Sequence, residues 1–189
     1  MAETRATYFC IDIECSGPVP ALYDMISLGA VAVAPDDDGK LHLGATHYVE
    51  LRPEAPRVDP GAMKVNGLDI EQLRAHGVPR RQALEALTAW TKAHTKPGTK
   101  PVFVGHNAPF DWSFVSWAYA AEDLPNPYGY KALDTKALAT GKLNLHWFDS
   151  SKEVLAERLN LPAEDLVQKH RADYDAQYQA ELLIKLLEY

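Results

Sequence analysis

Polar and apolar residues alternate near the start of the chain. Over residues 8–14, Ile11 and Ile13 fall on one side, while Asp12 and Glu14 fall on the other. A period of two residues predicts a β-strand, because successive side chains of a strand point to opposite faces. The first predicted strand therefore carries two acids on one face.

Two further β-rich runs cover residues 25–34 and 41–51, and the turn-forming sequence PDDDG lies between them at 35–39. This arrangement predicts a β-hairpin. A short apolar run at 102–104 follows a Lys-Pro-Gly break and predicts one more buried strand.

Most of the other residues have helical spacing. The predicted helices cover residues 80–94, 109–124, 134–138, 151–159 and 174–187. Asp69 with Gln72 three positions later signals a further helix start, and Asp134 is expected to cap a helix. In the helix from Pro109, an apolar stripe is expected at Phe110, Phe114, Trp117 and Ala121. A hairpin followed by alternating helices and strands predicts an α/β fold, with helices packed against a mixed sheet.

The length of 189 residues suits one domain over residues 1–189, and the first six residues are expected to be flexible. Acidic residues outnumber basic ones by 26 to 19, so the chain has no global positive field with which to hold a long polyanion. Any nucleic acid must therefore be held locally.

The two cysteines, Cys10 and Cys15, lie too close together to frame a disulfide scaffold. Reduced cysteines suit a reducing compartment. The chain shows neither a signal-peptide pattern nor an apolar run of membrane-spanning length. We therefore expect a cytoplasmic protein that does not interact with membranes.

The acids of the first strand are candidates for metal binding. Asp12 and Glu14 stand two residues apart at the end of the strand, so both carboxylates point the same way. The spacing alone is weak evidence, because Asp69 and Glu71 have it too and are better explained as the start of a helix.

A third acid, Asp111, falls in the helix that begins at Pro109. It shares a helical face with Phe114, Val115 and Ala118, which turns its carboxylate toward packed surface, where an acid needs a partner. The alternative is an ordinary acid of the first turn, a position that the helix dipole favours.

The last cluster of polar residues precedes and begins the C-terminal helix. Asp175 falls beside the small residues Ala172 and Ala176, which allow its face to approach a sheet. Asp173 points roughly 160° away and is predicted to be a surface acid. His170 lies just before the helix, where it could approach a reacting atom or could equally be a plain surface or packed residue.

Carboxylate oxygens suit hard Mg²⁺ or Mn²⁺ ions, and the absence of a Cys/His cluster argues against structural zinc. Two such ions about 3.5 to 4 Å apart can clamp the attacking and leaving oxygens of a phosphoryl displacement. Such a site needs carboxylates that both ions share.

Three segments together resemble the motifs of the DEDD exonucleases of the histidine subtype (DEDDh). They are residues 9–17 (FCIDIECSG), 104–111 (VGHNAPFD) and 170–176 (HRADYDA). The last has the His-x-Ala-x-x-Asp form that distinguishes the histidine subtype from its tyrosine relatives. Residues 24–31 (DMISLGAV), 65–67 (VNG) and 133–135 (LDT) also match the usual family pattern.

The resemblance implies a ribonuclease-H-like fold with a mixed five-stranded sheet flanked by helices. It implies that Asp12, Glu14, Asp111 and Asp175 hold two Mg²⁺ or Mn²⁺ ions, and that His170 takes a proton from the attacking water. It further implies that the terminal nucleotide is bound near Ile13, Cys15, Ser16, Val65, Asn66 and Phe110. Ser16 stands where many members have threonine, and Cys15 replaces a commoner Thr or Ala, so contacts to the terminal sugar are expected to differ.

These features favour a metal-dependent 3′-5′ exonuclease that acts on single-stranded DNA or RNA and releases nucleoside monophosphates. Two alternatives remain open: a proofreading subunit that works with a polymerase, and a binding module that has the fold without the chemistry. A homodimer is a further possibility that the sequence does not decide. Because degeneration usually removes a carboxylate or the histidine, the presence of all five residues favours the enzyme.

Overall fold

The computed structural model describes residues 6–189, and these contain a five-stranded sheet. Its strands are β1 (Ala6–Cys15), β2 (Met25–Pro35), β3 (Leu41–Glu50), β4 (Lys100–Gly105) and β5 (Ala132–Asp134). The expected flexibility of residues 1–6 lies outside the described residues except at Ala6, which pairs with Lys100 in the sheet.

The strands lie in the order β3-β2-β1-β4-β5, so β1 is central. Strands β1, β2 and β3 pair antiparallel, and the predicted hairpin of β2 and β3 is confirmed. Strand β4 pairs parallel with β1 and with β5. The predicted α/β class and the mixed five-stranded sheet flanked by helices are both confirmed.

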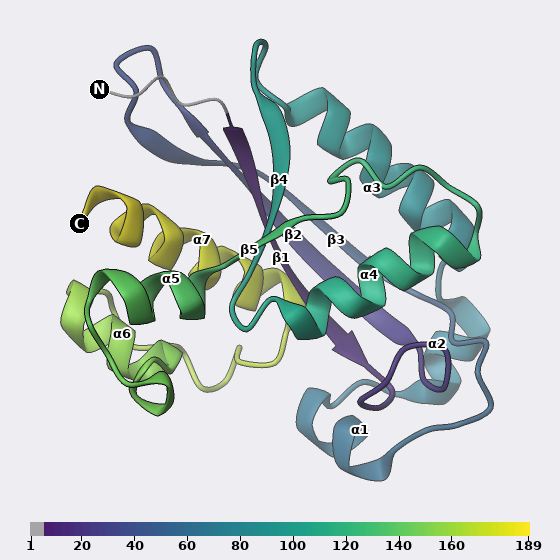
Figure 1. Cartoon of the computed structure of the whole chain (residues 1–189). Helices are drawn as coiled ribbons and strands as arrows, with labels where there is room; N and C mark the ends of the chain where they lie inside the picture. The colour runs from purple at the N-terminus through teal and green to yellow at the C-terminus, as the bar shows by residue number, and fades with distance from the viewer. Residues whose placement is uncertain (1–5) are drawn as a thin grey trace.

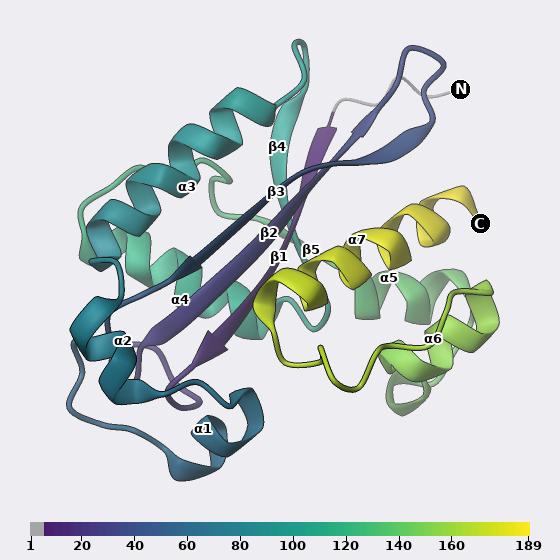
Figure 2. The ribbon, with the colours of Figure 1, turned by 180° about the vertical axis from the view of Figure 1, so that it is seen from behind.

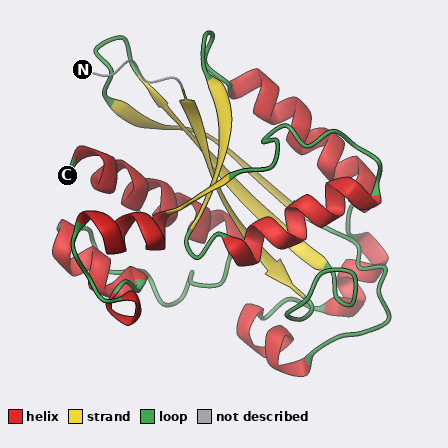
Figure 3. Ribbon diagram, viewed as in Figure 1, coloured by secondary structure: helices red, strands yellow, loops and turns green. Residues whose placement is uncertain are grey.

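Helices cover both faces of the sheet (Figures 1 and 2). In the described part of the chain they are α1 (Pro60–Asn66), α2 (Ile70–His76), α3 (Arg80–His94), α4 (Pro109–Ala121), α5 (Thr135–Lys142), α6 (Lys152–Leu159) and α7 (Ala172–Glu188), with a short 3₁₀ turn at Trp147–Asp149. Helices α3 and α4 lie on one face and α7 on the other, with α5 and α6 beside α7 (Figure 3). None of the helices between Ala6 and Tyr189 is long and apolar enough to cross a membrane.

The two faces of β1 serve two different cores. Ile11 and Ile13 pack toward α3 and α4, in a large cluster that includes Leu84 of α3 and Phe114 of α4. On the other face, Cys10 lies in a cluster with small and aliphatic residues of α7, namely Ala176, Ala180 and Leu183. These three residues form a core face of α7, and Leu187 packs against the same cluster while partly exposed.

The apolar stripe predicted for α4 is partly wrong. Phe110 and Ala121 are exposed, and the buried side chains are Asp111, Phe114, Val115, Ala118 and Tyr119. Helix α4 is apolar on nearly every side, so periodicity alone does not select the face that packs against the sheet. The face predicted from Asp111 is the correct one.

The predicted helix starts at Asp69, Asp134 and Ser151 are confirmed. Each of these side chains accepts hydrogen bonds from backbone N–H groups in the first turn of α2, α5 and α6, respectively. Helix α5 runs four residues beyond its predicted end at 138, and α7 begins two residues before its predicted start at 174. Helix α1 and strand β5 were not predicted, because neither is long enough to show a period.

Helix α7 approaches β2 so closely that only glycine fits at position 29. A Cβ atom on Gly29 would lie 2.1 Å from the carbonyl oxygen of Ala172 and 2.4 Å from the backbone N of Asp173. Gly29 pairs with Asp12 across the sheet. The start of α7 is therefore seated directly beside the acidic end of β1.

We expect Gly29→Ala to destabilise the protein by about 1 to 3 kcal/mol or more, because the backbone of α7 must move away. Gly141→Ala in α5 is the matched control: nothing lies within 4 Å of its Cβ position, so it should be neutral or stabilising by up to about 1 kcal/mol. Urea unfolding of both variants measures the difference. Equal stabilities would contradict the close approach.

Candidate active site

A cavity of about 390 Å³ lies beside the C-terminal half of β1. Residues from three elements and a loop line it: Asp12, Ile13 and Glu14 from β1, Phe110 and Asp111 from α4, Asp175 from α7, and His170 from the loop before α7. The other lining residues are His106, Asn107, Lys136, Ser151, Lys152, Glu153 and Lys169. The four acids and the histidine singled out in the sequence therefore share one cavity.

Asp12 and Glu14 are both partly buried in this cavity. Burial raises the pKa of the Asp12 carboxyl well above its usual value, and the nearby Asp111 carboxylate adds to the effect. Burial, with the carboxylates of Asp175 and Asp111, raises the pKa of Glu14 to about 8. Both shifts show how poorly these negative charges are compensated by the protein alone.

Asp111 is hydrogen-bonded to the backbone of β1. Its Oδ1 accepts a hydrogen bond from the backbone N–H of Ile13 at 3.1 Å, and the residue is 5% exposed. Burial raises its pKa to about 7 although the Ile13 N–H opposes the shift. This acid is therefore not simply a solvated residue of a first helical turn.

Glu71 has the opposite environment. It is exposed in the first turn of α2 and pairs with Arg74 on the helix surface. The interpretation of the Asp69 and Glu71 pair as a helix start is confirmed.

A hydrogen bond from its own backbone holds His170 next to the Asp175 side chain. The N–H of His170 donates to Asp175 Oδ2 at 2.8 Å, and His170 has a positive φ of 67°. One ligand atom each from Glu14, His170 and Asp175 lie within 4.8 Å of one another, so the three could hold a metal ion. Carboxylates with one imidazole and no thiolate fit a hard divalent cation.

Asp173 does not line the cavity. Its side chain is 33% exposed and pairs with Arg171 at 3.0 Å. The structure therefore separates the two acids of α7, Asp173 and Asp175, as the helical geometry predicted.

Two residues of the site were missed by the sequence analysis. Lys152 Nζ lies 2.8 Å from Asp175 Oδ1, and Gln179 Nε2 donates to Asp12 Oδ1 at 2.5 Å. Gln179 stands one helical turn after Asp175, and Lys152 is a cation in the first turn of α6, where the helix dipole disfavours positive charge. These positions are weak local signals in the sequence, and neither one identifies the acid that the side chain contacts.

Four of the residues expected near the terminal nucleotide lie outside the cavity lining. Cys15 is the last residue of β1 and Ser16 follows it, while Val65 and Asn66 are the last two residues of α1. Ser16 is fully buried and its Oγ accepts from the Asp24 N–H at 2.9 Å, while Asn66 Nδ2 donates to the Cys15 carbonyl at 3.2 Å. Val65 is 56% exposed. Ile13 and Phe110 are the expected contacts that do line the cavity.

Comparison with known proteins relates this cavity to nucleases. The family model described as 3′-5′ exoribonuclease Rv2179c-like domain matches residues 7–187. The chain is 32% identical over 183 residues to the 3′-5′ DNA exonuclease Cap18 of Escherichia coli, covering 96% of this chain and 92% of that protein. It is 31% identical over 179 residues to a ribonuclease T of Marinobacter nauticus, covering 91% of this chain and 78% of that one.

Solved structures share the fold at low identity. The nuclease domain of 3′hExo, a DEDDh family member bound to rAMP, has a TM-score of 0.78 at 15% identity and covers 96% of this chain and 92% of that chain. E. coli exonuclease I in complex with a dT13 oligonucleotide has a TM-score of 0.71 at 18% identity, covering 97% of this chain and 41% of that chain. The expected ribonuclease-H-like fold is thereby confirmed.

The family match extends over nearly the whole described chain, and the two relatives given above are named as a 3′-5′ exonuclease and a ribonuclease. This protein therefore belongs to the 3′-5′ exoribonuclease Rv2179c-like domain family and is a 3′-5′ exonuclease.

Proposed function

We propose that the whole chain forms one exonuclease domain that hydrolyses the last phosphodiester bond of single-stranded DNA or RNA by a two-metal mechanism. The observation that carries this proposal is the convergence of Asp12, Glu14, Asp111, Asp175 and His170 on one cavity. A water oxygen bonds to the phosphorus of the terminal nucleotide, and the bond from that phosphorus to the 3′ oxygen of the preceding sugar breaks. The products are a nucleoside monophosphate and a strand with a new 3′ hydroxyl.

We assign the four carboxylates to two Mg²⁺ or Mn²⁺ ions. When bound, such ions stabilise the charge on the attacking and leaving oxygens. Asp12 has an oxygen held by the Gln179 side chain, while Asp111 is held by the Ile13 N–H and Asp175 by the His170 N–H. These bonds fix the orientation of the carboxylates before any ligand arrives.

His170 is proposed to accept the proton of the attacking water. It is exposed at the cavity rim, and its backbone bond to Asp175 fixes its position relative to the proposed ligands. A positioned base of this kind raises the nucleophilicity of water at the moment of attack.

Aromatic residues near the cavity support a single-stranded substrate. Phe110 lines the cavity and is 36% exposed, while Trp147 and Phe148 are 41% and 81% exposed. Lys136, which also lines the cavity, has its Nζ 4.7 Å from the centre of the Trp147 ring. Exposed rings beside a lysine suit unpaired bases, whereas opening a duplex end costs a few kcal/mol.

The first test is degradation of 5′-labelled single-stranded DNA and RNA of several lengths, with and without Mg²⁺ or Mn²⁺. We expect a ladder of shortened labelled strands and release of nucleoside monophosphates, only with metal, and slower degradation of blunt duplexes.

Asp12→Ala should lower turnover on the order of 10³-fold or more. Glu71→Ala is the matched control, because this acid has the same spacing but lies on the surface, and it should leave turnover intact. Wild-type turnover in Asp12→Ala would end the proposal.

The second test separates the proposed base from the proposed metal ligands. His170→Ala should lower turnover by a factor on the order of 10² to 10⁴ while Mn²⁺ still binds. Asp175→Ala should lose Mn²⁺ affinity together with activity. Calorimetric titration of both variants with Mn²⁺ decides the matter: equally poor binding by the two variants would make His170 a ligand rather than a base.

The third test uses the raised pKa values of the acids. Protons compete with metal at a carboxyl below its pKa, and the pKa is raised to about 8 at Glu14 and about 7 at Asp111. Mn²⁺ binding near pH 7 should therefore release protons, and affinity should rise as the pH increases through these values. Calorimetry in buffers of different ionisation enthalpy measures the release. An apparent enthalpy that is the same in every buffer would contradict it.

A further inference from the structure

Lys152 lies between two carboxylates at the edge of the cavity. Its Nζ is 2.8 Å from Asp175 Oδ1 and 3.8 Å from Glu164 Oε1, and its side chain is 15% exposed. Asp175 is one of the proposed metal ligands, while Glu164 is not a lining residue of the cavity. The ammonium group therefore stands between an acid of the site and an acid behind it.

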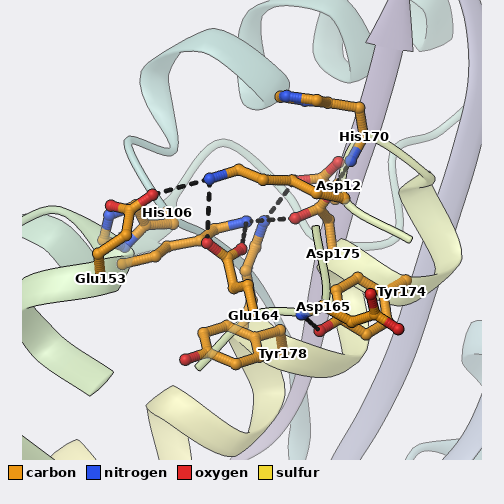
Figure 4. Close-up of polar contacts among 12 residues, drawn as sticks. Asp12, His106, Glu153, Glu164, Asp165, His170, Tyr174, Asp175 and Tyr178 are labelled. Atoms are coloured by element: carbon orange, nitrogen blue, oxygen red, sulfur yellow. Dashed lines mark hydrogen bonds and ion pairs between the residues drawn. The ribbon is translucent and has the colours of Figure 1, made fainter. Parts of the chain in front are cut away.

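Glu164 has an unused oxygen on the side that faces Lys152. Its side chain is 2% exposed, and Oε2 pairs with Lys169 Nζ at 3.2 Å. Oε1 is buried and has no hydrogen-bond partner among the described residues. Burying a carboxylate oxygen without a hydrogen-bond donor costs free energy. The Lys152 ammonium group, 3.8 Å from Oε1, is a donor only slightly beyond bonding distance. Figure 4 shows Glu164 on one side of this polar network and Asp12 and Asp175 on the other.

The electrostatics of helix α6 do not favour a lysine at position 152. It is the first residue of α6, where the partial positive charge of the helix end disfavours a cation. The compensation comes from the acids that surround it. The network thus holds a cation against the acids of the cavity.

We propose that Lys152 is an internal counter-cation that competes with metal for Asp175 and has Glu164 as its alternative partner. In the metal-free protein it bonds Asp175. When Asp175 binds metal, the ammonium group turns to Glu164 Oε1 and completes the bonding of that buried oxygen. Lys152 is thus a positioning residue that sets the affinity of the site. This inference rests on the proposed metal site.

The neighbouring Lys169 provides a control within the same network. Its Nζ pairs with Glu153 at 2.7 Å and with Glu164 at 3.2 Å, and it makes no ion pair with Asp12, Glu14, Asp111 or Asp175. Glu153 lines the cavity as an exposed acid that bonds Lys169 and makes no ion pair with Lys152. Glu153→Gln therefore removes a nearby negative charge that itself pairs with neither Lys152 nor Asp175.

The test is calorimetric titration of the full chain with Mn²⁺. Lys152→Met should tighten Mn²⁺ binding on the order of tenfold, because the competing cation is gone. Glu164→Gln should weaken it, because the lysine loses its charged alternative and remains on Asp175. Lys169→Met should change Mn²⁺ affinity less than Lys152→Met does. Glu153→Gln should change it less than Glu164→Gln does. A purely structural role would weaken binding in both main variants, so equal or weaker binding by Lys152→Met would overturn the inference.

A double variant tests whether Glu164 acts through Lys152. In the Lys152→Met background, Glu164→Gln should have little further effect on Mn²⁺ affinity, since the exchange no longer exists. Additive effects of the two substitutions would mean that Glu164 acts on the metal only as a distant charge, and would contradict the inference.

Thermal unfolding provides a second readout, which does not depend on calorimetric titration. Lys152→Met should lower the unfolding temperature in a chelator more than it does in saturating Mn²⁺, because the acids lose their internal cation only when metal is absent. Equal losses in both conditions would contradict the exchange. If the wild-type protein itself binds no Mn²⁺, the proposed function fails; if it binds Mn²⁺ and Lys152→Met binds no tighter, only this inference fails.

Discussion

The burial of four acids, Asp12, Glu14, Asp111 and Asp175, in one cavity is the constraint on which the rest of the structure depends. Burial raises the pKa values of Asp12, Glu14 and Asp111, and repulsion from neighbouring carboxylates adds to the effect. The fold opposes the repulsion with fixed donors, which include the Ile13 N–H and the His170 N–H. The acids themselves belong to β1, α4 and α7, so the carboxylates come together only when the sheet and both helices are in place.

The close packing of α7 on the sheet could be predicted in part from the sequence. The alanines of α7 predicted a face that could approach a sheet, and the period of two over residues 8–14 predicted the strand that it meets. What the sequence could not provide was the partner at Gly29, whose missing Cβ is explained only by the Ala172 backbone above it. The face of α4 was ambiguous because that helix is apolar nearly all round, and strand β5 has three residues, too few for a period to appear.

The residues of the candidate site also fall into those that the sequence predicts and those that it does not. The motifs located the acids and His170, since these residues recur in a fixed local pattern. Lys152 and Gln179 act through contacts between segments far apart in the chain, from Lys152 to Asp175 and from Gln179 to Asp12, and no local pattern encodes such pairs. Tertiary contacts also separate Cys15 and Ser16 from the cavity lining, because the strand irregularity between Glu14 and Cys15 and the bond from the Asp24 N–H to Ser16 Oγ turn the chain away.

The net charge of −7 poses the question of how such a protein holds a polyanion, and the cavity suggests an answer. Five acids and three lysines line it, so its lining is net negative when all of them are ionised. Two divalent cations would reverse that sign locally while the rest of the surface stayed acidic. Phosphate would then be attracted only to a loaded site, and a long strand would gain little from the surface beyond it. Such a charge distribution favours binding at an end of a strand over binding along its length.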